Sequence, residues 1–352
     1  MKKTLLTTAQ IAITIALLYF VFRDPAKRAQ MAAALHLANY WWIALGVVAY
    51  FGVEAAAAVR FGVLLRVQGI RLSNARVGAL FFIGMFYNQF MPGGTGGDII
   101  KSYLLLKETK DKKAGALLAV LFDRLIGLIA LIIITGVLIA LRYHWLASVP
   151  ETRRLLYILL IVLGSSLLAL VSSFIITGFN LLHSLPHRFP GREKLIEVAA
   201  AYHLYAKHWR ATLIGFAMSV IAHLGTFLTF LCVAYALHAQ DMRNVPPTPV
   251  PVVDFFAIMP IERTISSLPI SFGGAGWREI VLQILLSNLA GVQAGVANLI
   301  GTLGFLIILF CALPGGVIYF FYRPSGAAGH VKMREMRDEV ATLEHEISEQ
   351  EE

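Results

Sequence analysis

Apolar residues in this chain form long runs that are separated by short polar segments. The stretches 117–141 and 155–177 carry almost no charge, and each exceeds the roughly 20 residues that cross the core of a bilayer. The bilayer core holds no water to satisfy backbone groups, so such runs must be helical. The pattern predicts an all-α integral membrane protein, and its six full spans are expected at about 4–22, 40–59, 114–141, 155–178, 211–238 and 295–322.

Composition agrees with a membrane protein and excludes a soluble one. The chain is 58% hydrophobic and 14% charged, whereas soluble domains carry about 25% charged residues. The net charge of +9 is typical of basic residues that lie beside anionic lipid, so no nucleic-acid partner is predicted. No small-residue cleavage site follows Phe22, and we therefore expect the first span to be retained.

Two further apolar regions are interrupted by proline and clustered glycine. The first covers about 77–106 and is broken at 91–98, and the second covers about 252–289 and is broken at 266–276. Such clusters stop a helix, and the flanking arms are too short to span alone. Irregular backbone at membrane depth is tolerated only where it is buried in protein or lines a wet cavity. We therefore predict two re-entrant helical hairpins.

The distribution of basic residues supports this topology. With re-entrant hairpins, most lysines and arginines fall on one side, which the positive-inside rule makes cytoplasmic, and both termini lie there too. Three full spans then separate the hairpins, so they enter from opposite faces in an inverted-repeat arrangement, as in many transporters. The residues assigned to the cytoplasmic segments include Arg60, Arg66, Arg71, Arg76, Lys101, Lys107, Lys110, Lys112 and Lys113.

Residues outside the spans form two further segments. The loop 179–210 is basic and is predicted to hold an amphipathic interfacial helix. The membrane domain is expected to cover 1–323, and 324–352 to form a cytoplasmic acidic tail with a heptad stripe of apolar residues. The tail helix either rests on the cytoplasmic face or contacts a second copy of the chain.

Each hairpin turn offers a candidate anion site. The second arm begins at the turn, so the unpaired amides near Gly97 and Gly276 should lie deep in the protein at the positive end of a helix dipole. Glycines allow a phosphate to approach the backbone, although they also allow close helix packing. Asp98 and Glu279 either cap these helices or bind substrate. The candidate substrate-binding residues here are Asn88, Pro92, Gly93, Gly94, Gly96, Gly97, Asp98, Gly273, Gly274, Arg278 and Glu279.

Charged dipeptides inside apolar segments add four more candidates. Asp123 and Arg124 lie about ten residues into a span, roughly 15 Å of helix rise and near the expected bilayer centre, and Glu262 and Arg263 lie in the second hairpin. A charge at that depth costs at least about 2.5 kcal/mol. The residues form either fixed ion pairs or a headgroup site, in which the arginine fork binds phosphate.

Other polar residues and motifs add little. His223 is predicted to hydrogen-bond across helices, and the role of Glu54 stays open. The sequence holds no nucleotide-binding loop, nucleophile elbow or paired metal-binding histidines. No enzyme activity, cofactor or metal is therefore predicted.

Three motifs in order along the chain carry a family resemblance. Residues 88–98 (NQFMPGGTGGD), 123–127 (DRLIG) and 269–279 (PISFGGAGWRE) resemble the lysylphosphatidylglycerol synthase transmembrane family, also called the flippase-like domain family, over roughly 5–322. The resemblance implies a polytopic domain with re-entrant helices, which in some members moves a lipid across the bacterial inner membrane. Members that make lysyl-lipid carry a soluble aminoacyltransferase domain after the membrane part. Only 323–352 follow the last span here, so that activity is not expected.

Together these features predict a lipid translocase in a bacterial inner membrane. The resemblance implies a substrate among anionic phospholipids, aminoacyl-phospholipids, polyprenyl-linked lipids and hopanoid-type lipids. One alternative is a non-transporting scaffold that presents lipid to a glycosyltransferase or another lipid enzyme, and a second is an intramembrane enzyme that acts on lipid phosphate.

Overall fold

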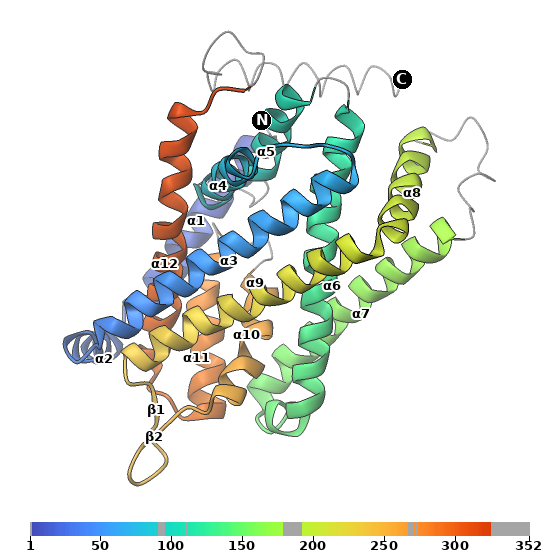
Figure 1. The fold of residues 1–352 in the computed structure, drawn as a ribbon. Helices are drawn as coiled ribbons and strands as arrows, with labels where there is room; N and C mark the ends of the chain where they lie inside the picture. Colours follow the sequence, from blue (N-terminus) through green and yellow to red (C-terminus); the bar gives the residue numbers. More distant parts are fainter. Residues whose placement is uncertain are drawn as a thin grey trace.

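The structure is a computed structural model, and it describes residues 2–90, 96–109, 112–178, 192–266, 271 and 274–324; within 2–10, 174, 177–178, 192–195 and 197 it describes the backbone alone. These residues form twelve α-helices and one two-stranded hairpin, β1 paired with β2 (Figure 1). The prediction of an all-α membrane protein is confirmed. The elements are α1 (Lys2–Phe22), α2 (Pro25–His36), α3 (Tyr40–Val67), α4 (Asn74–Phe90), α5 (Gly96–Glu108), α6 (Lys113–Leu146), α7 (Pro150–Gly178), α8 (Arg192–Lys207), α9 (Trp209–Ala236), β1 (Gln240–Asp241), β2 (Thr248–Pro249), α10 (Val252–Ser266), α11 (Trp277–Ala290) and α12 (Ala294–Phe321).

Five of these helices are long and apolar enough to cross a membrane, and they coincide with five of the six predicted spans. They are α3, α6, α7, α9 and α12. The remaining predicted span, 4–22, coincides with α1, whose crossing of the membrane stays a prediction. The main error concerns α3, which continues beyond residue 59 to Val67 and so holds Arg60 inside the helix. A helix ends where its backbone is capped, not where its apolar run ends.

The first interrupted region folds into two antiparallel helices. At one end, the Arg76 guanidinium of α4 donates to both carboxylate oxygens of Glu108 on α5, at 2.7 and 2.5 Å. At the other end, the Asn88 amide oxygen accepts a hydrogen bond from the Gly97 amide at 2.9 Å. A Cβ at Gly97 would lie 1.7 Å from the Gly84 carbonyl oxygen, so glycine is required for this close approach.

The second interrupted region also forms a helix pair. Glu262 lies near the end of α10 and faces Arg278 in the first turn of α11. Gly274 and Gly276 precede α11 with φ values of +77° and +85°, a region that glycine enters without strain. Figure 1 places α4 and α5 in the upper half of the molecule and α10 and α11 in the lower half. The turn residues 91–95, 267–270 and 272–273 lie outside the described part.

Long helices hold these two pairs in place. α3 and α9 run side by side through the middle of the molecule (Figure 1). α12 packs against α4 through Gly315, where a Cβ would lie 2.0 Å from the Phe82 carbonyl oxygen. The first helix pair is therefore joined to α12 by close backbone contact, and it contacts α6 through apolar as well as charged side chains.

Three elements were not predicted from the sequence. α2 begins at Pro25, and the Asp24 side chain caps it by accepting a hydrogen bond from the Ala26 amide at 2.9 Å. The strands β1 and β2 are only two residues long, too short for a period-two pattern to show. The helix expected within 179–210 is present as α8, and it packs on α6 through the stacked rings of Phe122 and Tyr205.

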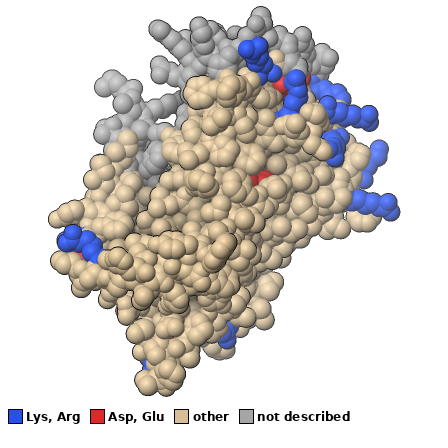
Figure 2. Space-filling model, turned by 60° about the vertical axis from the view of Figure 1, so that its left-hand side comes forward, with Lys and Arg blue, Asp and Glu red and all other residues tan. Residues whose placement is uncertain are grey.

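The surface is divided as expected for a membrane protein. In Figure 2, lysine and arginine side chains gather near the upper end and at a few places along the margin, and the broad surface between them is nearly free of charged groups. Apolar side chains on α7 are exposed, including Ile161 at 71% and Leu168 at 68%. This surface matches the hydrocarbon core of a bilayer.

Candidate functional site

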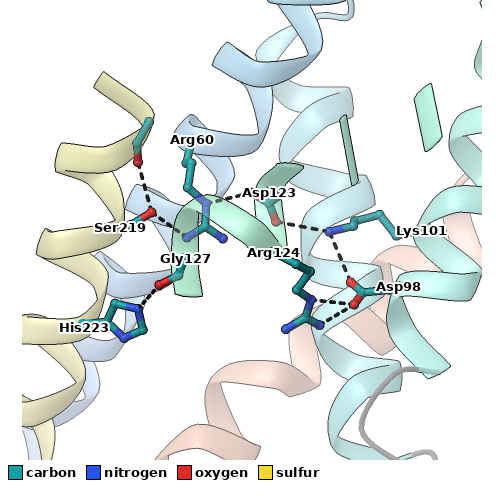
Figure 3. A network of polar contacts seen from close by, with 9 residues as sticks. Arg60, Asp98, Lys101, Asp123, Arg124, Gly127, Ser219 and His223 are labelled. Atoms are coloured by element: carbon teal, nitrogen blue, oxygen red, sulfur yellow. Dashed lines mark hydrogen bonds and ion pairs between the residues drawn. The ribbon is translucent and has the colours of Figure 1, made fainter. Parts of the chain in front are cut away.

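A buried carboxylate on α6 joins four helices in the first of two polar clusters. Asp123 is 2% exposed, and its carboxylate lies 2.7 Å from Arg60 Nε on α3 and 3.6 Å from Lys101 Nζ on α5 (Figure 3). Arg60 Nη1 also donates to Ser219 Oγ on α9 at 3.0 Å. A buried carboxylate needs such partners, because an unpaired charge in this environment is very costly.

The same cluster contains a second carboxylate, Asp98, in the first turn of α5. Arg124 on α6 approaches one Asp98 oxygen through Nη2 at 2.5 Å and Nε at 2.6 Å. Lys101 Nζ lies 3.4 Å from the other oxygen, so this ammonium is shared between Asp98 and Asp123. The Arg124 side chain is 55% exposed, whereas the Lys101 side chain is 4% exposed. Arg124 therefore lies at the outer edge of the cluster and Lys101 at its centre.

A cavity opens beside these ion pairs, and we call it the Asp98 cavity. Its volume is about 140 Å³, far above the roughly 10–15 Å³ that one water molecule requires. Glu54 on α3 contributes a further carboxylate to its wall and is 5% exposed. The lining residues are Tyr50, Glu54, Arg60, Phe81, Gly84, Met85, Asn88, Gln89, Asp98, Lys101, Asp123 and Arg124.

Sequence reasoning found part of this cluster and missed part. Asp98, Asp123, Arg124 and Asn88 were predicted site residues, and all four line the cavity. Arg60 and Lys101 were predicted to lie in cytoplasmic segments and were not predicted as site residues, but each lies within a helix and points toward Asp123 (Figure 3). The position of Lys101 three residues after Asp98, on the same helix face, was an available signal.

The charged dipeptides do not pair within themselves. Successive helical residues point in different directions, so Asp123 binds Arg60 and Lys101, whereas its neighbour Arg124 binds Asp98. α6 runs from Lys113 to Leu146, so Asp123 lies closer to the middle of that helix than to either end. Its expected position near the bilayer centre stays a prediction.

A second polar cluster lies at the junction of α10 and α11. Glu262 is fully buried, and its carboxylate lies 3.4 Å from Arg278 Nε. The Arg278 guanidinium also lies over the Phe305 ring, 4.3 Å from its centroid. Glu262 thus pairs with Arg278 across the helix junction and not with Arg263. Arg263 is half-buried, and within the described residues its side chain makes no hydrogen bond or ion pair.

At each helix start, one amide of the expected anion site is occupied by a side chain. The Gly97 amide donates to Asn88, and the Gly276 amide donates to Glu279 Oε2 at 2.7 Å. Glu279 therefore caps α11, whereas Asp98 is held by Arg124 and Lys101. An anion can reach either amide only by displacing these side chains. Gly96 is buried at the start of α5, and the predicted site residues Pro92, Gly93, Gly94 and Gly273 lie outside the described part.

A further polar residue, His223, does not line the Asp98 cavity. His223 Nε2 lies 3.0 Å from the Gly127 carbonyl oxygen on α6, which confirms the predicted hydrogen bond across helices (Figure 3). Among the described residues, no three His, Cys, Asp or Glu side chains lie close enough to hold a metal ion.

The helices and clusters define a polytopic membrane protein with buried polar sites in two broken-helix regions. Residues 7–315 match the family described as "Lysylphosphatidylglycerol synthase TM region", and the chain belongs to this family. The matched residues, 7–315, cover nearly all of the range, roughly 5–322, over which the sequence resembled this family.

One curated relative is the UPF0104 membrane protein PH1989 of Pyrococcus horikoshii. The chain is 27% identical to it over 181 residues, which are 50% of this chain and 49% of the relative. The alignment thus spans about half the length of each protein, and the relative's name states no activity.

Proposed function

We propose that this protein moves a lipid with an anionic headgroup across the membrane and that the Asp98 cavity receives the headgroup. The observation that carries this proposal is the position of Arg124. Its side chain is 55% exposed, yet it lies on the same face of α6 as Leu121 and Leu128, which are 48% and 41% exposed. A guanidinium on an apolar, exposed face of a membrane-spanning helix is suited to an anionic lipid that arrives from the side.

Energetics favour an exchange of partners at this arginine. An unpaired arginine in a spanning helix costs at least about 2.5 kcal/mol, and Asp98 offsets this cost when no lipid is bound. A phosphate or carboxylate in the cavity would offset it equally well, because it offers oxygens to the same planar fork. Asp98 then keeps Lys101 as its partner, so no charge is left alone during the exchange.

In this proposal the other contacts around the cavity stay in place while Arg124 exchanges Asp98 for the headgroup. Arg60 and Lys101 hold Asp123 in the interior, and α12 holds α4 by close packing at Gly315. In our proposal the headgroup enters between α5 and α6, and the acyl chains remain outside along Leu121 and Leu128. The protein needs only to shelter the headgroup, because the chains stay in lipid throughout.

The proposal includes the membrane topology. We propose that α4 with α5, and α10 with α11, are re-entrant hairpins that enter from opposite faces as an inverted repeat, and their location in opposite halves of Figure 1 supports this. The paired Glu262 and Arg278 then form the matching polar site near the other leaflet. We place the end with the starts of α4 and α6 in the cytoplasm of a bacterial cell, because Arg66, Arg76 and Lys112 lie there.

A lipid translocation assay with a panel of headgroups tests this function. The full-length protein is reconstituted into liposomes that contain a trace of fluorescent lipid, and a membrane-impermeant reductant bleaches the label in the outer leaflet. The panel contains anionic, zwitterionic, aminoacyl- and polyprenyl-linked lipids. We expect bleaching beyond the outer-leaflet fraction for at least the anionic lipid. Bleaching no greater than in protein-free liposomes, for every lipid and with folded protein, would contradict the proposal.

A further inference from the structure

A row of polar side chains runs along the contact between α11 and α12. Its first rung joins Glu279 of α11 to Thr302 of α12, with 3.4 Å between Glu279 Oε1 and Thr302 Oγ1. The second rung lies one helical turn away, where Asn298 Nδ2 of α12 donates to Gln283 Oε1 of α11 at 3.1 Å. A Cβ at Gly301 would lie 3.3 Å from Glu279 Cα, so the two helices pack closely at the first rung. Most neighbouring residues of both helices belong to the apolar core, which makes these polar side chains an exception there.

The Glu279 carboxylate has no counter-charge in contact with it. Glu279 is 2% exposed, and its Oε2 accepts a hydrogen bond from the Gly276 amide at 2.7 Å. Within the described residues no lysine, arginine or histidine forms an ion pair with it, and its chain neighbour Arg278 pairs with Glu262. The cap and the helix dipole offset part of the charge, but a buried carboxylate without an opposite charge is costly. The oxygen that needs a further partner is Oε1.

Asn298 supplies a second oxygen that needs a partner. The residue is fully buried, and in the described part of the chain its Oδ1 accepts no hydrogen bond. Buried side-chain oxygens are mostly hydrogen-bonded, so an orphan of this kind indicates a site for a water molecule or an ion. Thr302 contacts both residues, because its hydroxyl also lies 3.2 Å from the Asn298 carbonyl oxygen. Glu279, Asn298 and Thr302 therefore belong to one small oxygen-rich site.

The 3.4 Å between Glu279 Oε1 and Thr302 Oγ1 fits a shared cation better than a hydrogen bond. A hydroxyl approaches a carboxylate to about 2.5–2.7 Å, and two neutral O–H groups approach each other to about 2.7–2.8 Å. Ca²⁺ takes oxygen ligands at roughly 2.3–2.6 Å, so that neighbouring ligands of an octahedron lie roughly 3.3–3.7 Å apart. Na⁺ has nearly the same ionic radius as Ca²⁺, and a single carboxylate balances its single charge.

We propose that Glu279 Oε1, Thr302 Oγ1 and Asn298 Oδ1 bind a sodium ion between α11 and α12. The ion neutralises the buried carboxylate and gives the Asn298 oxygen its partner. Lys27 of α2 does not take this role, because its Nζ donates to Gln283 Oε1 at 2.9 Å, on the other rung. The site goes beyond the proposed function and does not depend on it, since sodium binding is measured without lipid.

The position of the site gives the ion a structural consequence. α12 packs on α11 at Gly301 and on α4 at Gly315. The ion therefore ties the start of α11, in the second helix pair, to the helix that contacts the first pair. Release of the ion would leave Glu279 with the Gly276 amide as its main support, so α11 should be held less firmly without sodium.

Sodium binding to the full-length protein in detergent tests the site. Binding of radioactive sodium is titrated with choline chloride keeping the ionic strength constant, and the melting temperature is compared in sodium chloride and choline chloride. The site variants are Glu279→Gln and Thr302→Val. Glutamine still accepts a hydrogen bond from the Gly276 amide, so Glu279→Gln keeps the cap of α11 and removes only the charge.

Thr226→Val is the matched control for Thr302→Val. The Thr226 hydroxyl donates to the carbonyl oxygen of Ala222, four residues back on α9, as Thr302 does on α12. We expect the wild type and Thr226→Val to bind sodium equally and to melt at a higher temperature in sodium chloride. Thr302→Val should need at least about tenfold more sodium for half-saturation, the loss typical of one contact to a charged group. Glu279→Gln should bind none and should melt alike in both salts.

Two results would overturn the site, and neither bears on lipid movement. A wild type that binds no sodium and melts alike in both salts would show that Glu279 serves only as a cap. Sodium binding that is equal in the wild type and Thr302→Val would place the ion elsewhere. If Glu279→Gln does not fold, the comparison of Thr302→Val with Thr226→Val decides, because neither variant changes a charge.

Discussion

Arg60 Nε lies 2.7 Å from Asp123 Oδ1, although the two residues are 63 positions apart in the chain. The same guanidinium donates to Ser219, so this contact joins α3, α6 and α9. By contrast, Arg124 reaches outward to Asp98 and is half-exposed. The cluster therefore combines an inner, fixed ion pair with an outer one that is open to exchange.

The inner pair should be essential for stability. Asp123→Asn leaves Arg60 and Lys101 buried with one fewer carboxylate, and removal of one partner from a buried ion pair costs about 3–5 kcal/mol. We expect a large fall in melting temperature in detergent. Glu151→Gln, which removes an exposed carboxylate from α7, is the control. Equal melting of Asp123→Asn and the wild type would show that the inner pair is not structural.

The close packing of α4 on α5 should not tolerate a methyl group at Gly97. A Cβ there would lie 1.7 Å from a backbone oxygen, whereas nothing lies within 4 Å of a Cβ at Gly78 on the same helix pair. Gly97→Ala should therefore fold poorly or melt much earlier than the wild type. Gly78→Ala should be neutral or more stable by up to about 1 kcal/mol, because alanine is the better helix former. If both variants melt alike, α4 and α5 do not pack as described.

The end of α11 depends on another glycine. Gly291 has φ +62°, and a Cβ there would lie 2.0 Å from Asp241 Oδ1. Gly291→Ala should lower the melting temperature through backbone strain and displacement of Asp241. Gly164→Ala is the control, since nothing lies within 4 Å of a Cβ there. Equal melting of the two variants would contradict the described contact between this glycine and β1.

Asp241 should also give stability a dependence on acid pH. Hydrogen bonds from the Arg243 side chain hold the pKa of Asp241 below its usual value, and Arg243 in turn donates to the Leu289 carbonyl oxygen at the end of α11. A carboxyl whose pKa is lower in the folded state stabilises the fold at every pH above its pKa in the unfolded state, which is near 3.9. This stabilisation is lost as the pH falls toward and through the pKa in the folded state. Melting temperatures measured from pH 6 downward should therefore fall more for the wild type than for Asp241→Asn. Parallel curves would contradict this linkage.

Five of the six predicted spans coincide with long apolar helices, because hydropathy and length determine such helices directly. The breaks at Pro92 and at Gly273–Gly274 likewise marked where the two helix pairs are interrupted. α2 was not predicted, because it is short and contains no long apolar run. Asp24 followed by Pro25 is nevertheless an N-cap signal. β1 and β2 are two residues each, too short for an alternating apolar and polar pattern to show in the sequence.

The partners of the charged residues could not be predicted from spacing. Sequence neighbours such as Asp123 and Arg124 point to different neighbouring helices, so their contacts depend on how α3, α5 and α6 are arranged. Arg60 and Lys101 were assigned to cytoplasmic segments because the predicted topology places them on the same side as the other basic residues. Burial, which a single sequence does not reveal, distinguishes them from the exposed basic residues nearby.

The most direct test of the Asp98 cavity is translocation by matched arginine variants in one assay. Arg124→Ala and Arg154→Ala each remove one exposed arginine from a long helix, but only Arg124 lines the cavity. Bleaching of labelled phosphatidylglycerol is followed in proteoliposomes with equal amounts of folded protein. We predict that Arg154→Ala moves lipid at the wild-type rate and that Arg124→Ala is slower by at least about tenfold. Equal rates for both variants would contradict the assignment of the headgroup to this cavity.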